Sequence, residues 1–304
     1  MERSTATSAV ISVPAPRDVL RLMKPVTWFP PMWAFMCGVV SSGAPLADRW
    51  LAAVAGILLA GPLICATSQA ANDWYDRHVD AINEPDRPIP SGRIPGRWGL
   101  WIALIWTAVS LAVAQALGPW VFVAAVVGMA LAWAYSAPPF RFKQNGWLGA
   151  AASALAYEGI TWFTGATVMT EALPSGEILS LAALYSLGAH GIMTLNDFKA
   201  IEGDRRMGIR SLPVQLGVKA AARLSCAIMA LPQAGVVALL LLWQRPWHAG
   251  IVAILLLAQL GLMARLLRDP ARLAPWYNAT GTTLYAFGML ASALAVSHLG
   301  GGHP

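Results

Sequence analysis

The chain is short of charge. Only 12% of its 304 residues are Asp, Glu, Lys or Arg, whereas 57% are hydrophobic, and soluble domains average about 25% charged residues. This shortage argues against a soluble globular protein. Long apolar runs alternate with short charged loops, which is the pattern of a polytopic membrane protein.

Other features that the sequence lacks exclude further classes. Its three cysteines, Cys37, Cys65 and Cys226, fit neither a disulfide framework nor a zinc site, and we interpret them as packing residues. The first 25 residues lack the apolar core and cleavage site of a signal peptide. No basic helix is interleaved with aromatic residues, so the net charge of +6 does not indicate a nucleic-acid partner.

The hydropathy pattern predicts an all-α bundle of about nine transmembrane helices, although eight or ten would also fit. We expect an N-terminal tail at 1–25, a single polytopic domain at 26–299 and a short C-terminal tail at 300–304. The nine expected spans are 26–46, 51–72, 97–117, 119–136, 146–167, 178–197, 218–243, 247–266 and 279–299.

The basic residues are distributed unequally between the two sides of this topology. All 21 Lys and Arg residues except Arg49 and Arg245 fall on the side that holds the N-terminus. Positively charged loops stay in the cytoplasm. We therefore expect a cytoplasmic N-terminus, a C-terminus on the opposite side, and a functional cavity that opens to the cytoplasm.

Two acidic clusters end apolar runs on that side. The first consists of Asn72, Asp73, Asp76 and Asp80. In a helix, Asn72, Asp76 and Asp80 lie on one stripe because they are four residues apart. Carboxylates at the edge of a bilayer suggest function, although a solvated helix end paired with nearby arginines would also explain them.

The second cluster consists of Asn196, Asp197, Glu202 and Asp204. Position 200 is an alanine, although the spacing of the first cluster would place a carboxylate there. Either Asp197 or Glu202 compensates, or a cation at this cluster takes fewer ligands from the protein. Simple pairing of these acids with neighbouring basic residues is the alternative.

Together the clusters predict a site for Mg²⁺ and a diphosphate, since Mg²⁺ prefers oxygen ligands and shares them with phosphate and water. Basic side chains on the same side could contact the phosphates directly, although positively charged cytoplasmic loops need basic residues in any case. The expected metal ligands are Asn72, Asp76, Asn196 and Asp204, and the expected phosphate contacts are Arg87, Arg141, Lys143 and Lys199.

These motifs carry a family resemblance. Residues 72–80 (NDWYDRHVD) with 87–92 (RPIPSG) resemble the first motif of the UbiA-type intramembrane prenyltransferases, and residues 196–213 (NDFKAIEGDRRMGIRSLP) resemble the second. Within that superfamily the chlorophyll synthases are the most similar, including the alanine at position 200. Further similar segments are 24–28 (KPVTW), 135–139 (YSAPP) and 143–147 (KQNGW), and the segments 157–159 (YEG) and 190–195 (HGIMTL) resemble the bacteriochlorophyll branch.

The resemblance implies an activity. A geranylgeranyl or phytyl group would pass from its diphosphate to the propionate of a chlorophyllide or bacteriochlorophyllide, with Mg²⁺ as cofactor and diphosphate as leaving group. A propionate is ionised near neutral pH, so the acceptor needs no general base. The implied location is a bacterial inner, photosynthetic membrane, where lipid and pigment-binding proteins would be the partners.

Three residues are candidates for contact with the pigment. Glu158 is a carboxylate inside an apolar span, which marks it as a functional hypothesis, and a packing role is its alternative. His190 could ligate the central metal of the pigment or simply form a hydrogen bond. Trp28 could stack on the macrocycle or belong to an interfacial aromatic belt.

Two rival functions remain open. A prenyltransferase of the same type could use a quinone precursor or haem as acceptor, although the alanine at position 200 counts against it. A transporter or pigment-assembly protein would use the acids to line an ion path. Transport sites lie near the middle of the membrane, whereas both clusters lie at one face.

Overall fold

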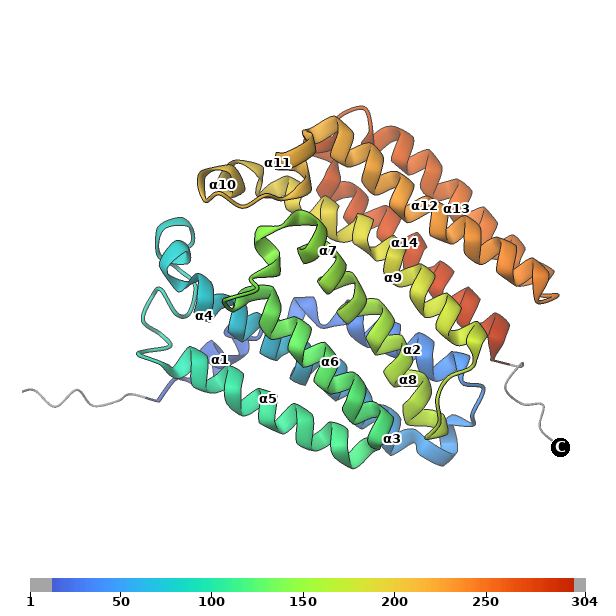
Figure 1. The fold of residues 1–304 in the computed structure, drawn as a ribbon, viewed down its shortest axis with the longest axis horizontal. Coiled ribbons are helices and arrows are strands. Elements are labelled where there is room, and N and C mark those ends of the chain that lie inside the picture. Colours follow the sequence, from blue (N-terminus) through green and yellow to red (C-terminus); the bar gives the residue numbers. More distant parts are fainter. Residues whose placement is uncertain (1–12, 298–304) are drawn as a thin grey trace, which may run out of the picture.

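The computed structural model describes residues 13–297, and these residues fold into one helical bundle (Figure 1). Seven of its helical segments are long and apolar enough to cross a membrane. Two further apolar segments, the short helix α2 (Phe29–Ser41) and the interrupted helix of α7, η4 and α8, bring the total near the expected nine. The all-α membrane fold is therefore confirmed, with an approximate helix count.

The helices of the first half are α1 (Pro16–Leu22), α3 (Leu46–Leu58), α4 (Ala66–Asn83), α5 (Trp98–Leu117), α6 (Pro119–Ser136), α7 (Gly146–Ala154) and α8 (Thr161–Thr170). Those of the second half are α9 (Gly176–Asn196), α10 (Ile201–Arg206), α11 (Leu212–Leu216), α12 (Val218–Leu242), α13 (Pro246–Leu266) and α14 (Pro270–Val296). Short 3₁₀ segments are η1 (Pro25–Thr27), η3 (Phe142–Gln144) and η5 (Asp197–Lys199).

Two long helices contain π-helical segments. The segment η2 (Leu59–Cys65) joins α3 to α4 and contains Pro62, whose missing N–H removes one hydrogen bond from an α-helix. The segment η4 (Leu155–Ile160) joins α7 to α8. Such segments often occur at functional sites, and both contribute residues to the large cavity described below.

Helices α2 and α8 pack with their backbones almost in contact. A Cβ atom on Gly38 would lie 2.1 Å from the carbonyl oxygen of Trp162, and one on Gly165 would lie 2.0 Å from that of Phe35. Small residues allow such approach between membrane helices. Because α8 directly follows η4, this close contact with α2 holds η4 in place beside the cavity.

The segment expected as an N-terminal tail, 1–25, contains helix α1. Leu22 and Met23 at the end of α1 are buried with Ala66 and Ala70 of α4. Residues 1–12 and the expected C-terminal tail at 300–304 lie outside the described residues.

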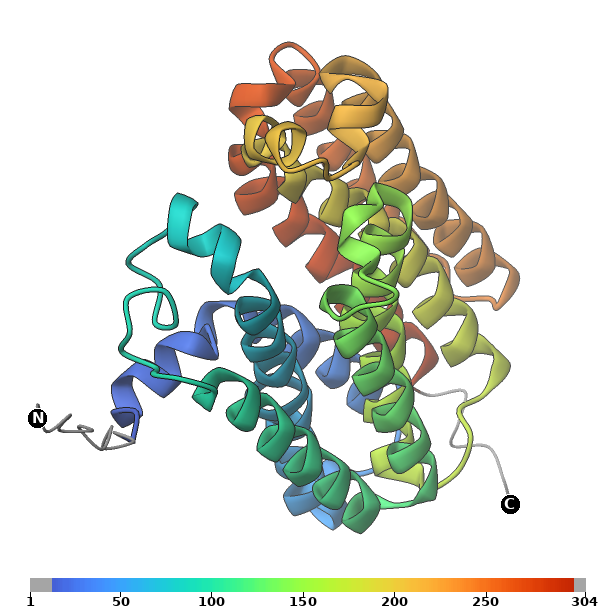
Figure 2. The same ribbon diagram turned by 60° about the vertical axis from the view of Figure 1, so that its left-hand side comes forward.

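The two acidic clusters lie at the same end of the bundle. The C-terminal end of α4 and helix α10 come close to each other there (Figures 1 and 2). Two backbone hydrogen bonds stabilise this end: Gly146 N donates to Arg210 O at 2.8 Å, and Arg210 N donates to Gln144 O at 3.0 Å. They connect the segment that carries Lys143 to the loop that follows α10.

Candidate active site

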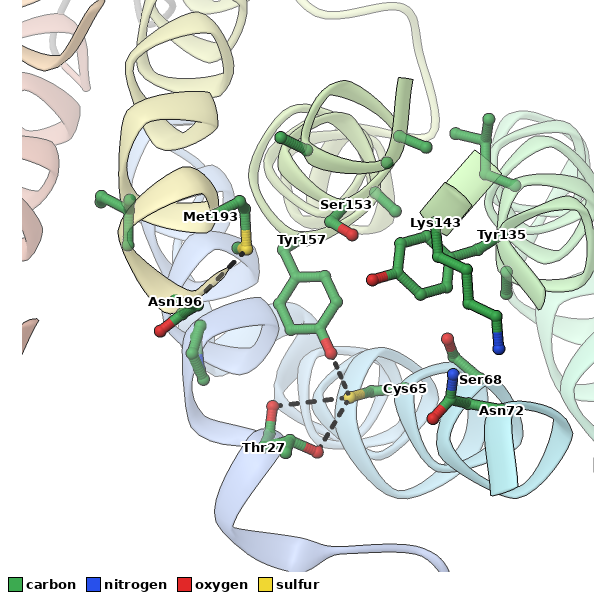
Figure 3. Close-up of a pocket in the computed structure, with 18 of the residues that line it drawn as sticks. Thr27, Cys65, Ser68, Asn72, Tyr135, Lys143, Ser153, Tyr157, Met193 and Asn196 are labelled. Atoms are coloured by element: carbon green, nitrogen blue, oxygen red, sulfur yellow. Dashed lines mark hydrogen bonds between the residues drawn. The ribbon is translucent and has the colours of Figure 1, made fainter. Parts of the chain in front are cut away.

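A cavity of about 670 Å³ opens between the two acidic clusters. Asn72 of α4 and Asn196 of α9 lie on opposite sides of it (Figure 3). Asp76 of α4 also lines the cavity. Of the other residues expected at the site, Lys143, Glu158, Asp197, Lys199 and Asp204 also line it. Residues about 120 positions apart in the sequence thus line one cavity.

On the α4 side, Asp76 is the centre of a hydrogen-bond network. Asn72 Nδ2 donates to Asp76 Oδ2 at 3.1 Å and lies 3.2 Å from Ser136 Oγ. Lys143 Nζ donates to the other oxygen of Asp76. Burial lowers the pKa of Lys143, and the charge of Asp76 opposes this shift. A buried cation therefore already faces the carboxylate at which a phosphate and a metal would bind.

On the α9 side, the two acids that line the cavity are Asp197 and Asp204. Asp204 is only 8% exposed, and in the part of the chain that the structure describes neither Asp197 nor Asp204 forms an ion pair. Burial raises the pKa of Asp204, and the hydroxyl of Ser211 opposes the shift. Carboxylates in such surroundings favour a bound cation.

Asp73 and Asp80 lie outside the cavity lining, in an ion-pair network with Arg87. Asp73 is fully buried, and its Oδ1 lies 2.7 Å from Lys24 Nζ and 3.2 Å from Arg87 Nη1. Asp80 Oδ2 lies 2.8 Å from the same Arg87 nitrogen. Arg87 also pairs with Glu84. This network joins α4 to the segments before and after it, and it supports the stripe that carries Asn72 and Asp76.

Four other expected residues also lie outside the lining. Glu202 is exposed and pairs with Arg205 and Arg206. The remaining three are Arg141, Trp28 and His190. Arg141 directly precedes η3. Trp28 Nε1 donates to Met23 O at 2.9 Å, and His190 Nε2 lies 3.3 Å from Trp147 O.

Glu158 is placed differently, because it lines the cavity from η4. It is only 7% exposed, and its Oε2 is buried and has no hydrogen-bond partner among the residues that the structure describes. Nearby on the same π-helical segment, the hydroxyl of Tyr157 lies 3.4 Å from Cys65 Sγ and accepts from Gln69 Nε2 at 3.3 Å. Figure 3 shows Tyr157 pointing towards Cys65.

Several lining residues were not identified from the sequence as site residues. Tyr157 and Tyr135 fall in segments that carry the family resemblance, but polar periodicity alone does not single them out. Asn278 and Thr282 of α14 also line the cavity. The last span was expected at 279–299, whereas α14 begins at Pro270, so Asn278 fell outside the expected helix. A polar residue within a membrane helix is the signal that would have identified it.

The oxygen donors fit Mg²⁺. Within residues 13–297 no three His, Cys, Asp or Glu side chains form a group that could hold a metal by themselves. Mg²⁺ is commonly bound by one or two carboxylates and completes its octahedron with phosphate and water. Asn72 with Asp76, and Asn196 with Asp204, would supply such partial sets from opposite sides of the cavity.

Comparison with known proteins yields one consistent family. Residues 27–286 match the UbiA prenyltransferase family. The chain is 59% identical to the bacteriochlorophyll synthase 33 kDa chain of Cereibacter sphaeroides, over 95% of each chain. It is 37% identical to the chloroplastic chlorophyll synthase of Avena sativa, over 92% of this chain and 76% of the relative.

A solved structure agrees in fold. The structure of a UbiA homologue from Archaeoglobus fulgidus bound to DMAPP and Mg²⁺ superimposes with a TM-score of 0.74 and covers 92% of this chain and 99% of its own. The two sequences are 20% identical. The helical arrangement described above is therefore similar to that of a solved UbiA homologue.

Proposed function

Because the chain belongs to the UbiA prenyltransferase family, we propose that it esterifies the propionate of a bacteriochlorophyllide with a prenyl group from a prenyl diphosphate. The donor carries a geranylgeranyl or phytyl chain. The observation that carries this proposal is the single cavity, lined by Asn72 and Asp76 from one motif and by Asn196 and Asp204 from the other. The similarity to a bacteriochlorophyll synthase over nearly the whole chain supports the choice of acceptor.

The reaction breaks the bond between the allylic carbon and the diphosphate oxygen. The diphosphate leaves with the electron pair, and a carboxylate oxygen of the propionate forms the new bond to carbon. Mg²⁺, when bound, neutralises charge on the departing diphosphate. No proton has to be removed from the ionised propionate, so this acceptor needs no general base.

The side chains of the cavity have distinct tasks in this proposal. Lys143 and Lys199 line the cavity and contact the diphosphate as point charges. Preorganised charge is effective in a water-poor site because it need not reorganise during the reaction. Asp73, Asp80 and Arg87 hold α4 in place, and Glu202 remains at the surface. Glu158 lines the cavity and forms a hydrogen bond to a polar substituent of the pigment in this proposal.

We place the end of the bundle that carries both clusters in the cytoplasm, with the N-terminus on that side and the C-terminus across the membrane. The basic residues support this orientation. The membrane is the bacterial inner membrane, and residues 26–299 act as a single prenyltransferase domain. Pigment-binding proteins that deliver the acceptor or receive the product are the expected partners.

The test is an assay of the purified protein with Mg²⁺, geranylgeranyl or phytyl diphosphate, and either chlorophyllide or bacteriochlorophyllide. Chromatography and mass spectrometry would identify the product. A prenyl ester formed preferentially with bacteriochlorophyllide is the expected result. If only a phenolic acid or haem were prenylated, the proposal that bacteriochlorophyllide is the acceptor would be refuted. Pigment binding or substrate movement without diphosphate release would indicate an assembly protein or a transporter.

A further inference from the structure

Helix α14 forms a wall of the cavity that neither sequence motif contains. Asn278 and Thr282 both line the cavity. They are four residues apart, so they project from the same face of the helix. Helix α14 also contacts η5, which carries Asp197 and Lys199 of the second motif. The C-terminal helix therefore reaches the proposed diphosphate site from a third direction.

Asn278 is joined directly to the second motif. Its Nδ2 donates to Asn196 Oδ1 at 2.8 Å. A carbonyl oxygen has two lone pairs, so Asn196 Oδ1 can accept this hydrogen bond and still bind a cation. Hydrogen bonds of this kind orient metal ligands and tune their affinity. The contact fixes the amide of Asn196 from outside its own helix.

Two polar atoms on this face are buried without a visible partner. Among residues 13–297, neither Asn278 Oδ1 nor Thr282 Oγ1 has a hydrogen-bond partner. A buried polar atom without a partner is unfavourable because its lost hydration is not compensated, and such atoms are uncommon in native structures. Both atoms belong to residues that line the cavity, where a bound ligand would satisfy them.

The second motif is short of one oxygen donor. Position 200 is an alanine that caps the short helix α10, and Glu202 points to the surface, where it pairs with Arg205 and Arg206. Asn196, Asp197 and Asp204 remain at the cavity. An amide oxygen from α14 would supply the missing donor without adding a further negative charge beside two unpaired acids.

We propose, on the basis of the function assigned above, that Asn278 completes the second half of the cation and diphosphate site. It holds Asn196 in its binding orientation and presents Oδ1 to the hydrated cation. Thr282 lies one turn further along α14, and its hydroxyl binds the water or phosphate oxygens around the same cation. Asn278 is a positioning residue for Asn196 and adds a neutral oxygen donor at the cluster in which position 200 lacks one.

Binding of Mn²⁺ in the presence of inorganic diphosphate tests this proposal without relying on catalysis. Mn²⁺ accepts the same oxygen ligands as Mg²⁺ and is detected by electron paramagnetic resonance. In the full-length protein, Asn278→Ala should raise the half-saturating Mn²⁺ concentration about 10-fold or more. Asn278→Gln keeps both an amide N–H donor and an amide oxygen and should retain binding to within about 3-fold of wild type.

Matched variants separate this role from simple packing. Thr283→Val alters an exposed neighbour whose hydroxyl donates to Ala279 O within α14, and it should bind Mn²⁺ as wild type does. Thr282→Val should weaken binding. If Asn278→Ala fails to fold, then Thr282→Val carries the test. Wild-type Mn²⁺ affinity in Asn278→Ala, or in Thr282→Val where Ala fails to fold, would overturn the proposal.

The outcomes also distinguish this inference from the proposed function. A wild-type protein that binds Mn²⁺ and diphosphate through Asn278 but forms no pigment ester would overturn the proposed acceptor and leave the role of Asn278 standing. A protein that forms the ester while Asn278→Ala retains wild-type Mn²⁺ affinity would overturn the inference alone.

Discussion

Lys143 donates a hydrogen bond to the carboxylate of Asp76, although the two residues are 67 positions apart in the sequence. The loop that carries Lys143 is tied to the segment after α10 by the hydrogen bonds of Gly146 and Arg210. The ammonium group of Lys143 is therefore held between the two motifs. When a diphosphate and its metal enter, Lys143 can exchange one oxygen anion for another without leaving its position.

The first prediction concerns this cation. Lys143→Met removes the charge while keeping much of the apolar stem, and it should lower kcat/KM for the prenyl diphosphate about 10²-fold. Lys143→Arg should retain part of the activity because it keeps a positive charge. Steady-state ester formation is the measurement. Arg206→Met, which alters an exposed residue paired with Glu202, serves as control, and equal activity of the two Met variants would refute the role of Lys143.

The second prediction separates cavity acids from surface acids. Asp76→Asn and Asp204→Asn should each lower kcat about 10²-fold or more, because each removes charge that would hold the cation on the leaving group. Glu202→Gln should stay within about 2-fold of wild type, since exposed ion pairs contribute little. The three variants differ only in carboxylate position, so similar losses in all three would contradict the assignment.

The third prediction concerns the metal. EDTA should abolish ester formation, and added Mg²⁺ should restore it, because without a divalent cation the carboxylates of Asp76 and Asp204 would repel the diphosphate. The half-saturating Mg²⁺ concentration should rise in Asp204→Asn. Turnover that persists in EDTA after extensive dialysis would exclude the metal-dependent ionisation.

The architecture could be predicted well from the sequence because each membrane-spanning helix is a long run of apolar residues. The spans 97–117, 119–136 and 247–266 lie within one residue of α5, α6 and α13 at each end. The spans at the ends of the chain were less accurate, since Pro270 starts α14 nine residues before the expected position. Charged and polar residues in its first turns lowered the apolar signal there.

The site was only partly predictable, because sequence spacing indicates which residues share a helical face but not which partners they meet. Asn72, Asp76, Asn196 and Asp204 meet at the cavity as their motifs suggested. Asp80 lies on the same stripe as Asp76, yet Arg87 engages it outside the lining. The contact of Asn278 with Asn196 joins residues 82 positions apart, and no local pattern indicates it.

The last prediction concerns Arg87, for which the sequence suggested a phosphate contact and the structure shows an ion-pair network. Arg87→Leu would leave Asp73, which is fully buried, with Lys24 as its ion-pair partner. Leaving a buried charge without any partner costs about 3–5 kcal/mol, and the loss here should be smaller because Lys24 still pairs with Asp73. The variant should therefore unfold at a lower temperature, while the folded fraction should keep its KM for the prenyl diphosphate.

Thermal unfolding in detergent and steady-state kinetics on the same preparation would decide between the two roles of Arg87. Asp80→Asn removes one partner of the arginine and should show a smaller loss of stability, since Asp73 and Glu84 still pair with it. Arg205→Leu, an exposed residue paired with Glu202, should change neither quantity. A raised KM with an unchanged melting temperature in Arg87→Leu would instead place the guanidinium on the diphosphate, and would require the segment that follows α4 to move into the cavity when substrate binds.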